Sequence, residues 1–258
     1  MSRQTCGGII LAGGKRALRE DALGVPKLLE QINDVPVLGH IIDSFMRSSI
    51  PGAKENTTVI ISARFESVLR TFITSHFPKV NIAVQLAHDG TARAIMEALE
   101  QHTFPNTDRV MILMGDQPLF TPKDMFDFYQ DFLPRQQVAG LSAFRGDRSK
   151  PEFIKCGKIF LDTAGNFVDV QPRVPVISNN ELLHAGPYLF DAKWLKGILA
   201  LLKKWTAHHN AEIHLYEALV AAAAGSGVAV IEGVPPTHCL GVDTLAALEE
   251  VRHRMPSK

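Results

Sequence analysis

The stretch Cys6-Gly7-Gly8-Ile9-Ile10-Leu11-Ala12-Gly13-Gly14 decides the fold of this 258-residue chain. Residues 6–12 form a short apolar run of strand length, and the two glycines that follow let the backbone bend sharply. The run lacks the strict alternation of apolar and polar residues that marks a strand with one face in water. It therefore predicts a first core strand that is covered on both faces.

Apolar runs of the same kind recur along the chain and alternate with amphipathic stretches. This alternation of strand and helix predicts an α/β fold with a mostly parallel central sheet flanked by helices, in three layers α/β/α. The strands are expected at residues 57–63, 80–86, 109–114 and 138–144, and the helices at residues 37–47, 66–77, 92–102 and 123–132.

The pattern changes after residue 144, but no linker separates a second domain. We therefore expect one domain over residues 1–258, with a first half at 1–145 and a specialised second half at 146–258. The second half should contain a hairpin of residues 152–160 and 166–170, strands at 183–190 and 228–234, and helices at 193–205, 215–223 and 244–254.

Charge and cysteine content limit the classes of protein that fit. The 27 Lys and Arg residues balance 27 Asp and Glu residues, so a dedicated nucleic-acid binder is not expected and any anion site must be local. Cys6, Cys156 and Cys239 are scattered without a metal-binding spacing, which is typical of a protein from the reducing cytoplasm. No apolar run reaches the length of a membrane span, so no membrane partner is expected.

Basic residues follow the glycine pair at the end of the first predicted strand. Backbone N–H groups at Gly13-Gly14, together with Lys15, Arg16, Arg19 and Lys27, could bind a phosphate chain. The spacing fits neither a P-loop nor a dinucleotide fingerprint. A simple turn after the strand is the alternative for Gly13-Gly14 taken alone.

Two aspartates and one glutamine also stand where strands end or helices begin. Asp116 follows the strand at 109–114 and Asp243 precedes the last helix, so the two carboxylates could share Mg²⁺. A turn-opening role for Asp116 and an N-cap role for Asp243 are the alternatives. Gln85 with Gly90-Thr91 could read the edge of a nucleobase, although Thr91 could instead cap a helix.

Taken in order, these segments resemble the GT-A-type nucleotidyltransferases, most of all the uridyltransferase domain of bacterial N-acetylglucosamine-1-phosphate uridyltransferases. That family carries an LAAGxGTRM loop followed by PK, a glutamine followed by GTA, a strand ending in GDxPL, and a GVN element. The resemblance covers nearly the whole sequence but not the family's acetyltransferase domain, so a single activity is expected. The similar segments are Leu11-Ala12-Gly13-Gly14, Pro26-Lys27, Gln85, Gly90-Thr91-Ala92, Gly115-Asp116-Gln117-Pro118-Leu119 and Gly241-Val242-Asp243.

The resemblance implies a Rossmann-like nucleotidyltransferase fold, Mg²⁺ held by Asp116 and Asp243, and release of pyrophosphate. It also implies that the first half binds the nucleotide and that Lys27 contacts the transferring phosphate. Arg16 or Arg19 would replace an arginine that the family carries in its loop, which gives all three basic residues an expected catalytic role. The implied nucleotide ligands are Leu11, Ala12, Gly13, Gly14, Gln85, Gly90, Thr91 and Asp116.

The resemblance places the acceptor in the second half, near Gly157, Gln171, His184 and Gly186. Gln171 stands where the family has Glu, and His184-Ala185-Gly186 where it has Asn-Thr-Gly, so the acceptor stays open. The expected partners are a nucleoside triphosphate, first of all UTP, and a phosphorylated acceptor similar to N-acetylglucosamine 1-phosphate. The LAGG and GDQPL segments also resemble the molybdenum-cofactor nucleotidyltransferases, which transfer CMP or GMP. A nucleotide-binding regulatory protein without catalysis is a further alternative.

Overall fold

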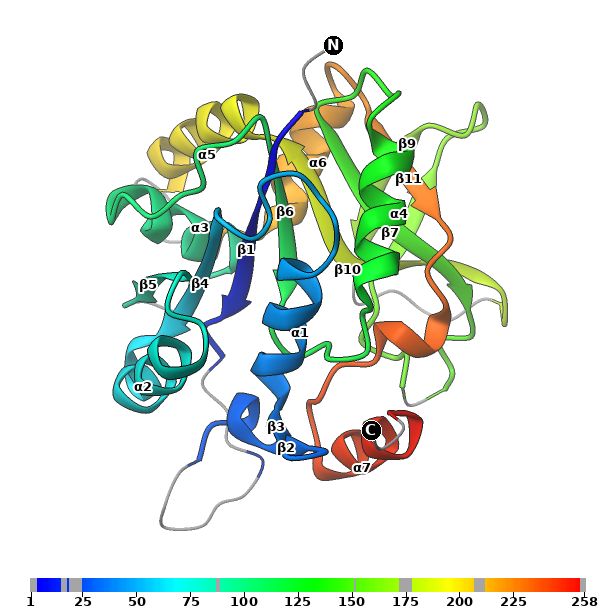
Figure 1. Ribbon diagram of the computed structural model, residues 1–258. Helices are drawn as coiled ribbons and strands as arrows, with labels where there is room; N and C mark the ends of the chain where they lie inside the picture. Colours follow the sequence, from blue (N-terminus) through cyan, green and yellow to red (C-terminus); the bar gives the residue numbers. More distant parts are fainter. Residues whose placement is uncertain are drawn as a thin grey trace.

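The computed structural model describes residues 4–14, 18, 25–86, 89–150, 152–171, 178–206 and 212–255. Its centre is one large sheet with the strand order β11-β7-β10-β6-β1-β4-β5, which β8 and β9 extend from β10 (Figure 1). These strands are β1 (Cys6–Ala12), β4 (Thr57–Ser62), β5 (Asn81–Gln85), β6 (Arg109–Met114), β7 (Ala139–Gly146), β8 (Lys158–Leu161), β9 (Phe167–Gln171), β10 (Glu181–Asp191) and β11 (Val228–Glu232).

Helices cover both faces of this sheet, as the three-layer prediction requires. One face carries α1 (Val37–Met46), α2 (Glu66–His76) and α4 (Pro122–Phe132), and α7 (Leu245–Arg254) contributes buried side chains to the hydrophobic core on the same side. The other face carries α3 (Thr91–Glu100), α5 (Ala192–Thr206) and α6 (Leu215–Ala223). Short 3-10 helices complete the described elements: η1 (Lys27–Leu29), η2 (Ala63–Phe65) and η3 (Pro236–Cys239).

The residues of each central strand divide between two hydrophobic cores. In β1, Ile10 packs into the core on the α1 side and Ile9 into the core on the α3 side. In β6, Met111 and Leu113 face the first core while Ile112 faces the second. Because successive side chains of a strand point to opposite faces, both sets must be apolar when both faces are covered. This explains the unbroken apolar runs in the sequence.

The sheet is parallel in the first half and mixed in the second. Strands β1, β4, β5 and β6 are parallel neighbours, and β11 runs parallel to β7. Strand β10 is antiparallel to both β6 and β7, and its pairing with β7 shifts between His184 and Tyr188. This irregularity lies beside the end of β6, where Asp116 follows.

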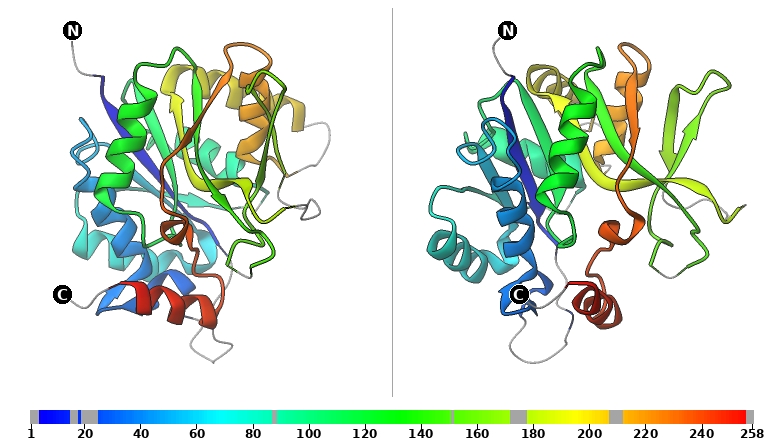
Figure 2. Two further views of the ribbon diagram at one scale, coloured as in Figure 1. Left: turned by 90° about the vertical axis from the view of Figure 1, so that its right-hand side faces the viewer. Right: turned by 45° about the vertical axis from the view of Figure 1, so that its right-hand side comes forward.

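The hairpin predicted in the second half is shorter than the sequence indicated. Residues 158–161 and 167–171 form β8 and β9, which stand out at the right of the right-hand view in Figure 2. The predicted strand residues 152–157 instead form a turn, so that part of the expectation is wrong. The N–H of Phe153 bonds to the carbonyl of Lys150, and the N–H of Cys156 to that of Phe153. These local hydrogen bonds replace a strand ladder because the Phe153 ring packs against Phe144 in the core.

A small ribbon that the sequence analysis did not predict fixes the last helix. Strands β2 (Gln31–Ile32) and β3 (Val35–Pro36) are joined by Asn33 and Asp34, both with positive φ. An Asn-Asp pair between short strands is a signal for this tight hairpin turn. The Arg252 guanidinium of α7 donates to the carbonyl of Gln31, so the C-terminal helix lies against the ribbon (Figure 1).

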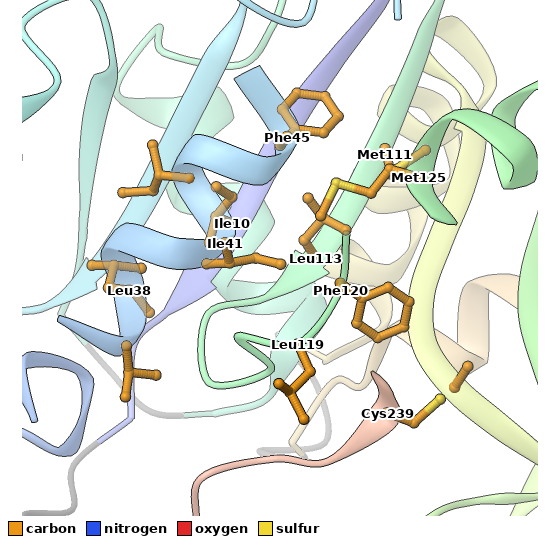
Figure 3. Packing of buried hydrophobic residues seen from close by; sticks show 14 of the residues in the cluster. Ile10, Leu38, Ile41, Phe45, Met111, Leu113, Leu119, Phe120, Met125 and Cys239 are labelled. Atoms are coloured by element: carbon orange, nitrogen blue, oxygen red, sulfur yellow. The ribbon is translucent and has the colours of Figure 1, made fainter. Parts of the chain in front are cut away.

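The core on the α1 side also supports the segment that follows β6. Leu119 and Phe120 lie among Met111, Leu113 and Met125, with Cys239 of η3 next to them (Figure 3). The turn that carries Asp116 is therefore attached at its far end to packed apolar side chains. Among the described residues, no helix has the length and apolar character needed to cross a bilayer.

Candidate functional site

Lys27 lies between two carboxylates that come from distant parts of the chain. Its Nζ is 2.5 Å from Oδ2 of Asp116 and 2.8 Å from Oδ1 of Asp243. The Lys27 side chain is 9% exposed, whereas the two aspartates keep about a third of their surface or less in water, at 27% and 32%. The structure thus brings together the three residues that the sequence analysis assigned to the phosphate and the metal.

Backbone contacts hold the two aspartates next to each other. The N–H of Val242 donates to the carbonyl of Asp116 over 2.8 Å, which ties the segment after η3 to the end of β6. The side chain of Thr244 accepts the N–H of Ala247 and caps α7. Asp243 is therefore not the N-cap of this helix, and its carboxylate remains available for the site.

The lysines and the aspartates of this cluster stabilise each other's charged forms. Burial disfavours the Lys27 ammonium, but Asp116 and Asp243 outweigh that effect and raise the pKa of Lys27 above its ordinary value. Burial likewise disfavours ionised Asp243, but Lys27 and Lys155 lower the pKa of its carboxyl to about 2. Asp243 is consequently a carboxylate and Lys27 an ammonium throughout the neutral range.

The donor set of this cluster fits Mg²⁺. Carboxylate oxygens are the ligands that hard cations prefer. The Lys27 ammonium contacts both carboxylates, which shows that the two side chains are close enough to share one cation. The described residues contain no group of three or more His, Cys, Asp or Glu side chains that could enclose a metal. A magnesium ion here would take Asp116 and Asp243 and complete its shell with water and substrate phosphate, as Mg²⁺ commonly does.

The glycine pair lies beside this cluster and beside Gln85. A Cβ built on Gly13 would come within 2.1 Å of Oε1 of Gln85, and one on Gly14 within 3.9 Å of Cε of Lys27. The Gln85 side chain is buried at the end of β5, next to the end of β1. Leu11 accepts the N–H of Gly115 through its carbonyl, and Ala12 is buried. Lys15, Arg16 and Arg19 lie outside the described residues.

Gly90 and Thr91 contact a segment far away in the chain. A Cβ on Gly90 would lie 2.0 Å from the carbonyl oxygen of Ile213, and Gly90 has φ +109°. The Thr91 hydroxyl accepts the N–H of Leu215 over 2.8 Å. Thr91 thus supports the start of α6, whereas its own helix α3 has Gly90 as its N-cap residue and therefore no side-chain cap. The expected cap role therefore applies to a different helix.

The four residues expected at the acceptor are spread over the hairpin and β10. The N–H of His184 donates to the carbonyl of Gly157, so these two lie together. The imidazole packs at a tilt of 47° against the ring of Tyr188, with ring centroids 4.4 Å apart, and its Nε2 is buried without a hydrogen-bond partner in the described chain. Gln171 is exposed and donates to Asp169. Gly186 lies against Gln117 rather than beside Gln171.

Two residues that the sequence analysis left without a role, Gln117 and Lys155, lie near the two aspartates. The Gln117 amide nitrogen donates to the carbonyls of Ala185 and Cys239, each over 2.9 Å, and so joins the end of β6 to β10 and η3. Lys155 approaches from the turn before β8, and its Nζ lies 2.9 Å from Oδ2 of Asp243. The GDQPL motif contained Gln117, but nothing in its spacing indicated where the amide points.

Comparison with known proteins identifies the family. A model described as "MobA-like NTP transferase domain" matches residues 8–254. The chain belongs to this MobA-like NTP transferase family. Membership confirms the expectation of a nucleotidyltransferase.

Individual relatives of this MobA-like chain are distant. It is 25% identical over 254 residues to the bifunctional protein GlmU of Psychrobacter sp. (strain PRwf-1), covering 97% of this chain and 51% of that protein. The chain thus spans about half the length of the curated relatives it matches. The inositol-1-phosphate CTP transferase from T. maritima superposes with a TM-score of 0.71 at 17% identity, over 98% of this chain and 96% of that one.

A protein described as a glucose-1-phosphate thymidylyltransferase from Bacillus anthracis superposes with a TM-score of 0.72 at 16% identity. The match covers 97% of this MobA-like chain and 95% of that structure. Similarity at such low identity shows the fold alone. It confirms the predicted nucleotidyltransferase architecture.

Replacement of Gly90 by alanine should destabilise the protein strongly. Gly90 combines φ +109° with ψ 167°, a region almost restricted to glycine, and its Cβ would strike backbone rather than a movable side chain. We expect a loss of about 3 kcal/mol in the free energy of unfolding, measured by urea denaturation. Gly165→Ala, with φ +84° and open space around it, should lose only about 1 kcal/mol. Equal losses would contradict the clash with Ile213.

His184 should make the stability depend on pH in the mildly acidic range. Burial lowers the pKa of His184 to about 4, against a weaker opposing effect of the Pro187 backbone, from an ordinary value near 6.5. Between pH 6.5 and 4 the folded protein binds fewer protons at this site than the unfolded chain, so stability falls as the pH falls.

The loss attributable to His184 between pH 7 and 5 should be about 2 kcal/mol. Urea denaturation of His184→Asn at both pH values should show a correspondingly smaller decrease than in the wild type. His253→Asn, on the exposed side of α7, serves as the control and should follow the wild type. An identical pH dependence of His184→Asn and the wild type would refute the assignment.

Proposed function

We propose that this chain is a Mg²⁺-dependent nucleotidyltransferase that couples a nucleoside triphosphate, UTP first of all, to a sugar 1-phosphate. N-acetylglucosamine 1-phosphate is the model for the acceptor, and pyrophosphate is the second product. The observation that carries the proposal is the Lys27 ammonium between Asp116 and Asp243, beside the glycine pair at the end of β1. Family membership supports the reaction class.

In the proposed reaction, a phosphate oxygen of the acceptor attacks the α-phosphorus of the triphosphate. The bond between the α-phosphorus and the oxygen bridging to the β-phosphorus breaks, and pyrophosphate leaves with that electron pair. Bound Mg²⁺ would neutralise charge on the phosphate oxygens. Lys27 would hold the α-phosphate, and the two aspartates would fix its position. Such a transfer requires positioning and charge neutralisation but no covalent nucleophile.

The base would lie near Gln85 and the loop that ends at Gly90. The amide of Gln85 is buried next to Gly13 and offers both a donor and an acceptor, as recognition of a base edge requires. Because the side chain touches the glycine pair, base and phosphate binding would take place within one short segment. A side chain at position 13 would displace the amide of Gln85, so glycine at this position keeps the proposed base-reading group in place.

The thiols are not suited to covalent chemistry, and they fit the proposed cytoplasmic location. Cys6, Cys156 and Cys239 are free cysteines. Burial raises the pKa of Cys156 to about 11 and raises that of Cys239 as well. A thiol that stays protonated at neutral pH is a poor nucleophile. This supports direct transfer between the two substrates.

A second candidate is transfer of CMP or GMP to a molybdopterin-like acceptor. The matched family model favours it, as does the resemblance of Leu11–Gly14 and Gly115–Leu119 to molybdenum-cofactor enzymes. The triphosphate preference separates the two candidates, because the first uses UTP and the second CTP or GTP.

A thermal-shift screen of ATP, CTP, GTP and UTP with Mg²⁺ should identify one stabilising nucleotide. Saturation at a hundred times Kd adds about 2.7 kcal/mol to the free energy of unfolding, and for a chain of this size raises Tm by about 5 °C or more. UTP is the expected ligand, while a shift with CTP or GTP alone would favour the second candidate. No shift with any of the four would contradict both.

Replacement of Asp116 by asparagine should reduce kcat/KM by about a hundredfold or more, because the change removes one carboxylate from the proposed magnesium site. Release of pyrophosphate from the preferred triphosphate and a panel of sugar 1-phosphates provides the measurement. Asp131→Asn on the exposed side of α4 is the matched control and should retain full activity.

Unchanged pyrophosphate release by Asp116→Asn would contradict the assignment of Asp116 as a magnesium ligand. Nucleotide binding without turnover of any acceptor in the wild type would instead favour a regulatory protein.

A further inference from the structure

We infer that Lys155 binds the phosphate group of the acceptor and that, before the metal binds, an ion pair with Asp243 keeps this lysine next to the site. The inference rests on the proposed function and names a substrate-binding residue for it. It begins from the geometry of Asp243, whose two oxygens contact different lysines. Oδ1 lies 2.8 Å from Nζ of Lys27 and Oδ2 lies 2.9 Å from Nζ of Lys155.

The two lysines reach Asp243 from opposite halves of the chain. Lys27 follows the glycine loop, and its Cε lies next to Gly14 on the nucleotide side. Lys155 belongs to the turn between β7 and β8, two residues before Gly157, whose carbonyl holds His184. Lys155 therefore stands on the side of the hairpin and β10, away from the glycine pair.

An in-line displacement brings negatively charged groups to both of these sides. The attacking oxygen and the leaving pyrophosphate lie on opposite sides of the α-phosphorus, so the acceptor must enter from the side away from the triphosphate tail. An acceptor phosphate carries negative charge that would repel the triphosphate. Lys155 is placed to neutralise that charge on the entry side, while Lys27 serves the transferring phosphate.

The exposed fractions of the two lysine side chains indicate which of them a bound metal would displace from Asp243. The Lys155 side chain is 61% exposed and can move at little cost, whereas the Lys27 side chain is 9% exposed and fixed by two carboxylates. A metal that takes Oδ2 of Asp243 would therefore displace Lys155 and not Lys27. The released ammonium then lies within a side-chain length of the metal, ready for the phosphate that enters next.

The inference predicts opposite effects on metal and acceptor when Lys155 is replaced. In Lys155→Met, Oδ2 of Asp243 loses its competitor for the metal, so Mn²⁺ should bind about three- to tenfold more tightly in the absence of nucleotide. The KM of the sugar 1-phosphate should rise at least about tenfold at saturating triphosphate, while the KM of the triphosphate stays within about twofold. Lys155→Arg keeps the positive charge and should retain most of the acceptor affinity.

The measurements are electron paramagnetic resonance of free Mn²⁺ and steady-state release of pyrophosphate. Lys150→Met is the matched control, because it removes an exposed lysine from the same segment without touching Asp243, and both readouts should match the wild type. A variant damaged in folding would lose affinity for Mn²⁺ and acceptor together, which differs from the expected divergence. An acceptor KM within twofold of the wild type, or unchanged Mn²⁺ affinity, would overturn the inference.

Failure of the proposed function would be recognised separately. If the wild type releases no pyrophosphate with any substrate pair, the reaction is wrong, and inorganic phosphate replaces the acceptor as the probe. Calorimetry would then measure phosphate binding to the Mn²⁺-loaded protein, which should be about tenfold weaker in Lys155→Met than in the wild type. Equal phosphate affinities would overturn the role of Lys155 independently of any turnover.

Discussion

The repulsion between Asp116 and Asp243 is the constraint on which this site depends. Two carboxylates held close together, with limited access to water, destabilise each other unless a cation lies between them. Lys27 supplies that cation within hydrogen-bond distance of both. Lys27 lies near the start of the chain, and Asp243 follows 216 residues later. Charge neutralisation therefore joins the two halves of the domain at the point where the chemistry is expected.

The sheet provides the framework for this contact. Parallel strands β1 and β6 are neighbours, so the glycine pair and Asp116 leave the sheet at the same edge. Strand β10 then enters antiparallel beside β6, and its irregular stretch receives the Gln117 amide. The same amide holds η3, from which the chain continues to Asp243. One side chain thus aligns the acidic strand end, the acceptor half and the C-terminal segment.

The sequence was sufficient for the layers and for the charged centre, and physical reasons explain what it missed. Apolar runs placed the strands because both faces of the sheet are covered, and strand ends indicated Asp116 because ligands gather at that edge. Lys155 gave no such signal, since an exposed lysine in an irregular turn follows no periodicity. The surroundings of His184 depend on the shifted pairing of β10 with β7, which tertiary packing determines. The hydrogen bond of the Thr91 hydroxyl was not predicted, because it accepts the N–H of Leu215, a residue 124 positions later in the chain.

The attachment of α7 to the β2–β3 ribbon has a consequence for how the site could open. The hydrogen bonds from Arg252 to the Gln31 carbonyl are exposed, and exposed contacts of this kind are among those that open in local unfolding. The segment from η3 to α7 lies outside the central ladder, so it could detach as a unit while β1, β4, β5 and β6 keep their hydrogen bonds. Such an opening would remove Asp243 and leave Lys27 paired with Asp116 alone. Hydrogen exchange at residues 236–255 would then report the assembly of the metal site directly, separately from the stability of the sheet.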